Sequence, residues 1–290
     1  MRQLALILTL AAPVAAQTPL HVQLADIAKD AKGTVSVACA LPGVTLDCDL
    51  NEHGHPPMQS VFKLPLAIVV LQKVEAGKLA LDQQVRFETS DLYKGSYSPL
   101  QDAHPTANVD VPLSELLRLS VQLSDNIATD ILLRLIGGPT TVQASLNKLG
   151  FPTIHVVHSE RILHDDENLQ YQDSAEPAAM VALLRRLADN SPLTPDHAAL
   201  LNKLITETPS APKRMKGLLP AGTIVAHKTG SSGEDHGFYP ATNDVGLITL
   251  PNGKRLALAI FVTDSHTDDT TRELVMARIA KAIYDAALRR

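Results

Sequence analysis

The stretch that decides the fold of this chain reads Pro57-Met58-Gln59-Ser60-Val61-Phe62-Lys63-Leu64. A polar, proline-broken segment, residues 53–57, precedes Ser60, and an apolar run, Leu64 to Leu71, follows it. This change predicts a loop that delivers Ser60 to the first turn of a buried helix over residues 60–76.

Lys63 follows Ser60 by three residues, so both side chains share one face of the predicted helix. A serine is a weak nucleophile unless a neighbouring group takes its proton, and the N-terminus of a helix stabilises negative charge. Ser60 and Lys63 are therefore a candidate nucleophile and base. Alone, the Ser-x-x-Lys pattern is equally an ordinary helix start with a chance lysine.

Residues 1–16 have the pattern of a secretory signal. Arg2 gives the positive start, residues 4–12 the apolar stretch, and Val14-Ala15-Ala16 a small-residue cleavage site. The apolar stretch is too short to span a bilayer, and no later segment has the apolar length of a membrane helix. We expect cleavage near Ala16 and a soluble protein secreted to the periplasm.

About 270 residues remain, enough for one large domain or two interlocked ones. The formal net charge is only −5, basic residues are scattered, and aromatic residues make up 3% of the chain. These values exclude a basic, aromatic-lined surface, so we expect no nucleic-acid partner.

The two cysteines, Cys39 and Cys48, lie in one short region. Residues 34–40 and 44–50 have strand-like patterns around a turn at Pro42-Gly43, which predicts a hairpin. Such a hairpin places the cysteines opposite each other in an oxidising compartment, which favours a disulfide. A slipped register would instead leave two free thiols.

The middle of the chain has a helical period. The predicted helices cover residues 60–76, 111–136 with a break at 124–126, 140–149, 175–187 and 194–206. Residues 155–173 are polar and without a clear period, and a loop of that length in a compact domain is usually functional or disordered.

Strand patterns return after Pro220. They cover residues 223–228, 244–250 and 256–263, with a turn at 251–253, and a last amphipathic helix spans about 270–288. Strands at both ends of a helical middle predict an α+β fold, with one antiparallel sheet built from both chain ends. We expect an α/β sandwich domain over residues 17–58 and 207–290, and an inserted all-helical domain over residues 59–206.

Two more short motifs have both a functional and an ordinary interpretation. Ser124-Asp125-Asn126 lies at a break between helices, where a hydroxyl and an amide can face a cleft, although all three residues also favour helix caps. Lys228-Thr229-Gly230-Ser231 ends a strand where glycine lets a ligand approach the backbone, or where a turn simply begins.

Together and in this order, the three motifs resemble those of the serine β-lactamases and penicillin-binding proteins. Class A β-lactamases add a glutamate in a long loop between the second and third motifs. Glu160 lies 36 residues after Ser124 and 68 before Lys228, which matches that pattern and makes residues 155–173 the omega loop. Only this spacing distinguishes Glu160 from a solvated surface acid.

His164 departs from the usual class A pattern, which has asparagine four residues beyond the glutamate. With Gln59 before the serine and the segment 215–222 before the third motif, the chain resembles the PER/VEB-type branch. That branch carries histidine here and often hydrolyses extended-spectrum cephalosporins. We expect His164 to orient the omega loop or its water; a merely packed or exposed histidine is the alternative.

The resemblance implies hydrolysis of the β-lactam amide of penicillins and cephalosporins through an acyl-enzyme on Ser60, and hence antibiotic resistance. The backbone N–H groups of Ser60 and Ser231 would form the oxyanion hole. Ser124 would pass a proton to the departing nitrogen, and Glu160 would activate the deacylating water. Whether Lys63 or Glu160, through a water, is the acylation base is disputed for the family.

The resemblance also implies a substrate-binding set. Asn126 would bond the side-chain amide, and an aromatic gate at Tyr97 would cover the substrate unless Tyr97 packs in the core. The substrate carboxylate would meet cations and hydroxyls. These come from Arg214, Lys228, Thr229 and Ser231. On sequence alone, Arg214 is equally a solvated arginine in a basic run.

Two other functions share much of this pattern. A penicillin-sensitive DD-peptidase would have the same fold and motifs without a deacylating glutamate, so penicillin would inhibit it rather than be consumed. The second alternative is a non-hydrolytic penicillin-binding sensor domain, which the signal segment and Glu160 disfavour. A metallo-hydrolase is disfavoured because His53 and His55, the closest pair among eleven histidines, are followed by two prolines rather than a carboxylate, and we find no ligand spacing in the others. We expect a monomer with a small-molecule β-lactam as partner, no metal, no cofactor and no membrane association.

Overall fold

The computed structural model describes residues 18–290, so the predicted signal segment, residues 1–16, lies outside the described part of the chain. Its helices are α1 (Leu20–Ala28), α2 (Lys63–Glu75), α3 (Pro99–Ala103), α4 (Leu113–Gln122), α5 (Asn126–Ile136), α6 (Pro139–Leu149), α7 (Glu160–Asp165), α8 (Pro177–Asp189), α9 (Pro195–Thr206) and α10 (Asp269–Leu288). Short 3-10 turns are η1 (Lys29–Ala31), η2 (Gln59–Phe62), η3 (Thr89–Asp91) and η4 (Glu167–Gln172). The strands are β1 (Thr34–Ala40), β2 (Gln84–Phe87), β3 (Val109–Pro112), β4 (Val225–Ser231), β5 (Tyr239–Thr249) and β6 (Arg255–Ser265).

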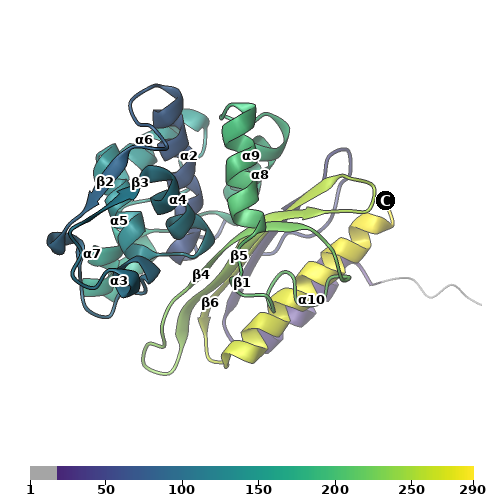
Figure 1. The fold of residues 1–290 in the computed structure, drawn as a ribbon. Coiled ribbons are helices and arrows are strands. Elements are labelled where there is room, and N and C mark those ends of the chain that lie inside the picture. The colour runs from purple at the N-terminus through teal and green to yellow at the C-terminus, as the bar shows by residue number, and fades with distance from the viewer. Residues whose placement is uncertain (1–17) are drawn as a thin grey trace, which may run out of the picture.

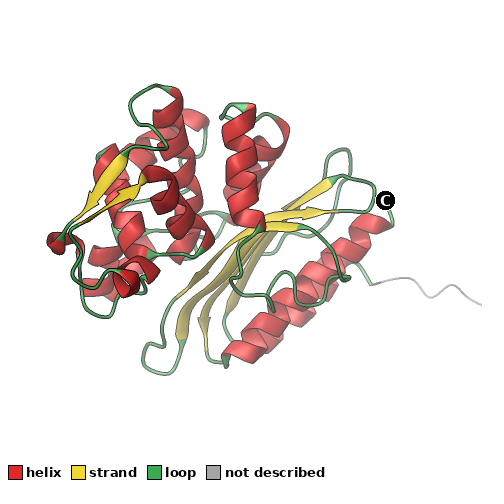
Figure 2. Cartoon of the chain, viewed as in Figure 1, coloured by secondary structure: helices red, strands yellow, loops and turns green. Residues whose placement is uncertain are grey.

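The main sheet has the strand order β1-β6-β5-β4, and all neighbouring strands are antiparallel. Its first strand comes from the N-terminal part of the chain and the other three from the C-terminal part. Figure 2 shows this sheet beside a group of helices. The α+β fold, with a sheet assembled from both chain ends, is therefore confirmed.

The two faces of the sheet have different partners. One face packs against α1 and α10, and α10 runs along it in Figure 1. Apolar side chains of the other face, such as Val245 and Phe261, belong to the same core as the central helices. The sheet also contacts the turn η2 that contains Ser60, so the junction between sheet and helices is where a site can form.

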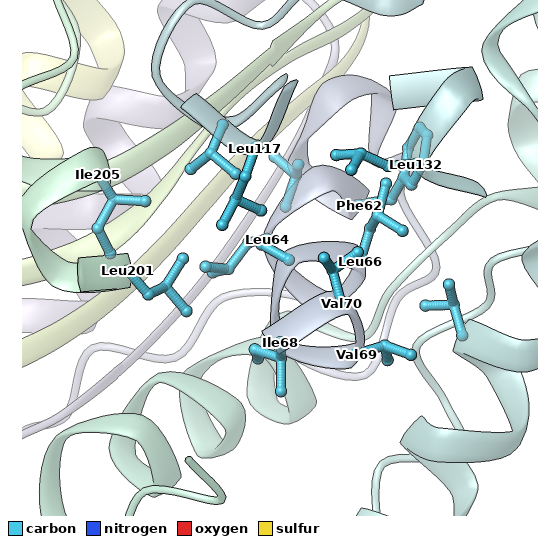
Figure 3. Packing of buried hydrophobic residues seen from close by; sticks show 14 of the residues in the cluster. Phe62, Leu64, Leu66, Ile68, Val69, Val70, Leu117, Leu132, Leu201 and Ile205 are labelled. Carbon is cyan, nitrogen blue, oxygen red and sulfur yellow. The ribbon is translucent and has the colours of Figure 1, made fainter. Parts of the chain in front are cut away.

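Helix α2 is the centre of the helical part. Nine consecutive residues, Lys63 to Leu71, are buried, as expected for a helix that is apolar on all sides. Figure 3 shows side chains of α2 packed against Leu117 of α4, Leu132 of α5 and Leu201 of α9. Pro65 is compatible with this helix because it lies in the first turn, where its missing N–H is not needed.

Three sequence expectations need correction. The helix expected from Ser60 is a 3-10 turn that contains Ser60, followed by α2 from Lys63. The omega loop is not structureless, because α7 and η4 lie within it; both are too short to show a period.

Residues 44–50 do not form a second strand, and only the bridges Val37–Leu50 and Leu41–Val44 remain of the predicted hairpin. Asp47 and Asp49, poor strand formers, interrupt that segment.

Cys39 and Cys48 form a disulfide across this irregular segment, with their Cα atoms 6.1 Å apart. The sequence did not predict helices α1 and α3 or the small sheet of β2 and β3. The domain limits at residues 58 and 207 stay a prediction.

Two absences concern the described residues alone. Between residues 18 and 290, every helix is too short or too polar to cross a membrane. In the same part of the chain, no three histidine, cysteine or acidic side chains are grouped to hold a metal ion.

The sheet is tied to the segment before Ser60 by Asn243 of β5. This side chain is fully buried, and its Nδ2 donates to the carbonyl oxygens of Pro57 at 2.8 Å and Met58 at 3.0 Å. The Asn243 amide thus serves two buried carbonyls, of which that of Met58 also accepts from the Val61 N–H at 3.2 Å.

Replacing that amide tests how far the fold depends on it. Asn243→Ala leaves both carbonyls without this donor, and we expect the free energy of unfolding to fall by about 1–3 kcal/mol. Urea unfolding followed by circular dichroism measures the change. Asn190→Ala, at an exposed position, is the control and should change stability by less than about 0.5 kcal/mol. A similarly small effect of Asn243→Ala would contradict the anchoring role.

Candidate active site

A cleft of about 460 Å³ lies at the junction of the helices and strand β4. Its volume is within the range of small-molecule sites. Most of the predicted site residues line it, namely Ser60, Tyr97, Ser124, Asn126, Arg214, Thr229 and Ser231. Gly230 of the third motif also lines it, and four lining residues had no prediction: Leu123, Ser210, Ala211 and Glu273. The three motifs are therefore brought together from separate elements.

Ser60 faces this cleft because two local features bring turn η2 against strand β4. Gln59 has a positive φ of 48°, which turns the chain immediately before the serine. A Cβ atom on Gly230 would lie 2.4 Å from the Met58 carbonyl oxygen and 3.2 Å from the Ser60 nitrogen. Only glycine allows this approach, which brings the backbone before Ser231 next to that of Ser60.

Lys63 is fully buried behind the cleft and contacts several predicted residues. Its Nζ donates to the Ser124 carbonyl oxygen at 2.7 Å and to Asn126 Oδ1 at 2.6 Å, and it lies 2.9 Å from Glu160 Oε1. Within residues 18–290 it makes no hydrogen bond to the Ser60 hydroxyl. Catalytic contacts are often longer without substrate and tighten when substrate binds.

Ser124 lies between two lysines. Its hydroxyl accepts from Lys228 Nζ at 3.1 Å and lies 3.5 Å from Lys63 Nζ. Lys228 is buried and also donates to the Thr229 carbonyl oxygen at 2.8 Å. Burial lowers the pKa of Lys228 well below its ordinary value, and the nearby Lys63 cation adds to this. A hydroxyl so placed can exchange protons with either ammonium group.

The helix break at residues 124–126 combines both expected roles. Asp125 is the cap of α5: it is fully buried, and its carboxylate accepts from the Ala128 N–H, the Ser98 hydroxyl and the Leu100 N–H at 2.7–2.8 Å. Ser124 has a positive φ of 62°. Capping by Asp125 thus fixes a strained turn from which Ser124 and Asn126 reach the cleft.

Glu160 is the first residue of α7 and only 7% exposed. Asp130 of α5 holds the start of that helix, because its carboxylate accepts the N–H groups of Glu160 at 2.8 Å and Arg161 at 2.9 Å. Burial, and next the charge of Glu160, raises the pKa of Asp130 to about 7. Sequence reasoning missed Asp130, although it lies four residues after Asn126 and hence on the same helix face.

His164 is an exposed residue whose ring nevertheless contacts the segment before Tyr97. Its ring packs against that of Tyr93, with centroids 5.3 Å apart, and a Cβ on Gly95 would lie 3.2 Å from its Cε1 atom. The Arg161 guanidinium covers the same Tyr93 ring at 4.9 Å. Tyr93 and Gly95 belong to the segment that leads to Tyr97, which is 62% exposed at the rim of the cleft. The omega loop and this rim therefore support each other.

Arg214 is 7% exposed, so it is not a solvated arginine. Its Nη1 donates to the carbonyl oxygens of Gly230 at 3.1 Å and Asn243 at 3.0 Å, and its Nη2 donates to Ser231 Oγ at 2.7 Å. Glu273 of α10, another residue that was missed, places Oε1 3.5 Å from the Arg214 Nε. Burial lowers the pKa of Arg214 from its ordinary value.

A smaller recess of about 120 Å³ continues between the omega loop and β4. Glu160, His164, Asn126 and Ser231 border it. Gln59 Nε2 donates to Gln170 Oε1 at 2.6 Å, which links the turn before Ser60 to η4. A water in this recess would lie beside Glu160.

Comparison with known proteins agrees with this geometry. The model of a family described as the β-lactamase enzyme family matches residues 19–287. The extended-spectrum β-lactamase PER-1 of Pseudomonas aeruginosa is 39% identical over 95% of this chain and 90% of its own length. β-Lactamase VEB-1 of the same organism is 36% identical over 92% and 89%.

Solved structures show the same likeness. The crystal structure of the TLA-1 extended-spectrum β-lactamase superimposes with a TM-score of 0.90 at 39% identity, covering 93% of this chain and 98% of that one. The chain belongs to the β-lactamase enzyme family, as a class A serine β-lactamase similar to PER-1 and VEB-1.

Proposed function

We propose that this protein opens the β-lactam amide of penicillins and cephalosporins by way of an acyl-enzyme on Ser60, and so confers resistance to them. The observation that carries the proposal is the buried contact between Lys63 and Glu160, 2.9 Å apart, behind the cleft that Ser60 lines. It brings groups for making and for removing an acyl-enzyme to one place.

In acylation, the Ser60 oxygen attacks the lactam carbonyl carbon and its proton passes to Lys63 or, through a water, to Glu160. The carbonyl oxygen becomes negative between the N–H groups of Ser60 and Ser231. Ser124 then gives its proton to the departing nitrogen as the C–N bond breaks. Its position between the Nζ atoms of Lys228 and Lys63 supports this role, because either ammonium can restore the proton.

In deacylation, Glu160 removes a proton from a water that attacks the ester carbonyl, and Ser60 leaves with a proton. The burial of Glu160 and its place beside the 120 Å³ recess support this role. A DD-peptidase or sensor domain lacks such a glutamate, and no contact described above favours either one. His164 acts by holding the omega loop against Tyr93, and so keeps Glu160 in position.

Substrate recognition falls to the strand side of the cleft. The substrate carboxylate binds near Thr229, Ser231 and the Arg214 cation, which already donates to the Ser231 hydroxyl. Asn126 bonds the side-chain amide, and Tyr97 forms the exposed rim. The name of PER-1 includes extended-spectrum activity, and we extend the proposal to extended-spectrum cephalosporins on that likeness. We further propose a monomer in the periplasm.

One prediction about the mechanism concerns Glu160. Glu160→Gln keeps the shape of the side chain but removes the base, so acylation should remain measurable while deacylation falls by about 10²–10⁴-fold. Mass spectrometry of the intact protein with a cephalosporin should show an acyl-enzyme that accumulates.

Asp165→Asn is the matched control, because Asp165 is an exposed acid of the same loop that lines neither the cleft nor the recess. It should turn substrate over like the wild type. If Glu160→Gln also does so, without acyl-enzyme, Glu160 is not the deacylating base.

Another prediction uses the raised pKa of Asp130. Its folded-state pKa is about 7 against an ordinary value of 3.8, so folding favours the protonated acid. This stabilisation is complete below about pH 4 and is lost as the pH rises through about 7. The asparagine of the Asp130→Asn variant cannot ionise, so the variant does not share this loss. Its free energy of unfolding minus that of the wild type should therefore increase by roughly 2–3 kcal/mol between pH 5 and pH 8.

Urea unfolding of both proteins at several pH values measures this difference. Asparagine also loses one acceptor for the two N–H groups, but that loss is the same at every pH and shifts only the level of the curve. A difference that stays flat from pH 5 to pH 8 would show that Asp130 is ionised throughout.

A further inference from the structure

We propose that a second cavity, lined by no residue of the three motifs, binds a small apolar molecule that carries one carboxylate. The cavity has a volume of about 370 Å³ and lies among the end of α8, the length of α9 and the β5–β6 hairpin. It shares no lining residue with the catalytic cleft. The proposal is independent of the proposed function.

The floor of this cavity is apolar. Leu201 and Ile205 of α9 and Leu247 of β5 line it, each at most 3% exposed, and Leu187 of α8 forms a half-buried wall. Such a surface gains free energy when a hydrocarbon or aromatic group covers it. The body of the ligand is therefore apolar.

The polar side of the cavity has one positive charge in excess. Arg185 and Arg255 lie close together beside a single acid, Asp189. Asp189 is engaged by Arg185 through both the Nε and the Nη2 atoms. Among residues 18–290, no carboxylate lies within 4.0 Å of the Arg255 guanidinium. The ligand should therefore supply a negative charge.

Arg255 is already held in place for such a ligand. Its Nη2 donates to the side-chain oxygen of Asn202 on α9, and its backbone carbonyl accepts from Arg185 Nη1 on α8. Burial lowers the pKa of Arg255, and the charge of Arg185 adds to this. Both effects disfavour the charged guanidinium, so a bound anion would stabilise it. A planar guanidinium with free N–H groups matches the two oxygens of a carboxylate.

The experiment titrates the mature protein with 4-phenylbutyrate and follows isotope-labelled leucine and isoleucine methyl groups by NMR. Leu201, Ile205 and Leu247 report on the second cavity, and Leu123 reports on the catalytic cleft. We expect shifts at the first three that saturate independently of any at Leu123. The neutral isostere 4-phenylbutanamide should bind at least about 10-fold more weakly, since a charged hydrogen bond contributes about that factor.

Arg255→Gln tests the cation directly and should weaken binding of the acid at least about 10-fold while leaving the amide unchanged. Arg118→Gln is the control, because Arg118 pairs with Glu115 on α4 and does not line the cavity. Equal binding of acid and amide to wild type, shifts at Leu123 alone, or unchanged acid binding by Arg255→Gln would each overturn the proposal. If Arg255→Gln does not fold, the comparison of acid with amide on the wild type decides.

Discussion

The packing of the helical part depends on one buried cation, Lys63, whose charge must be compensated. An ammonium group removed from water costs several kcal/mol unless oxygen atoms replace its hydration. Lys63 is fully buried, and its oxygen partners come from the α4–α5 junction and from the omega loop. Helix α2, the junction and the loop are far apart in the chain, so the packing of three segments is tied to a single side chain. The elements that this charge holds together are the ones that bring Ser124 to the cleft and Glu160 to the recess beside it.

A second constraint joins the helices to the sheet. Strand β4 passes so close to turn η2 that a methyl group at Gly230 would overlap the Met58 carbonyl. Asn243 on the next strand donates to that same carbonyl, so the backbone around Ser60 is held from the sheet side. Lys63 positions the residues around it, Ser124, Asn126 and Glu160, and the contacts of Gly230 and Asn243 position the backbone around Ser60. An oxyanion hole made of backbone N–H groups depends on the second set of contacts, because its donors act only when they are positioned in advance.

Periodicity was sufficient for most of the fold, and spacing selected residues most of which the structure brings to one cleft. The long amphipathic and apolar segments became helices and strands close to their predicted limits, because burial of one face determines them. Short elements were missed: α7 has six residues and cannot show a period, and residues 44–50 look like a strand but contain two aspartates. Glu273 and Asp130 were missed for another reason. Their roles arise from contacts with Arg214 and with the backbone of Glu160, and tertiary contacts of this kind leave no local pattern.

The position of Glu160 shows why motif residues alone do not make a site. A helix of six residues is not stable by itself, since forming its first turn costs more than its few hydrogen bonds return. Helix α7 exists because Asp130 accepts its first N–H groups and because Arg161 and His164 enclose the ring of Tyr93. None of these four residues belongs to the three motifs. A change at any of them acts on Glu160 through its backbone, so the histidine at position 164 has to be understood together with Tyr93 and Gly95, the surfaces that it contacts.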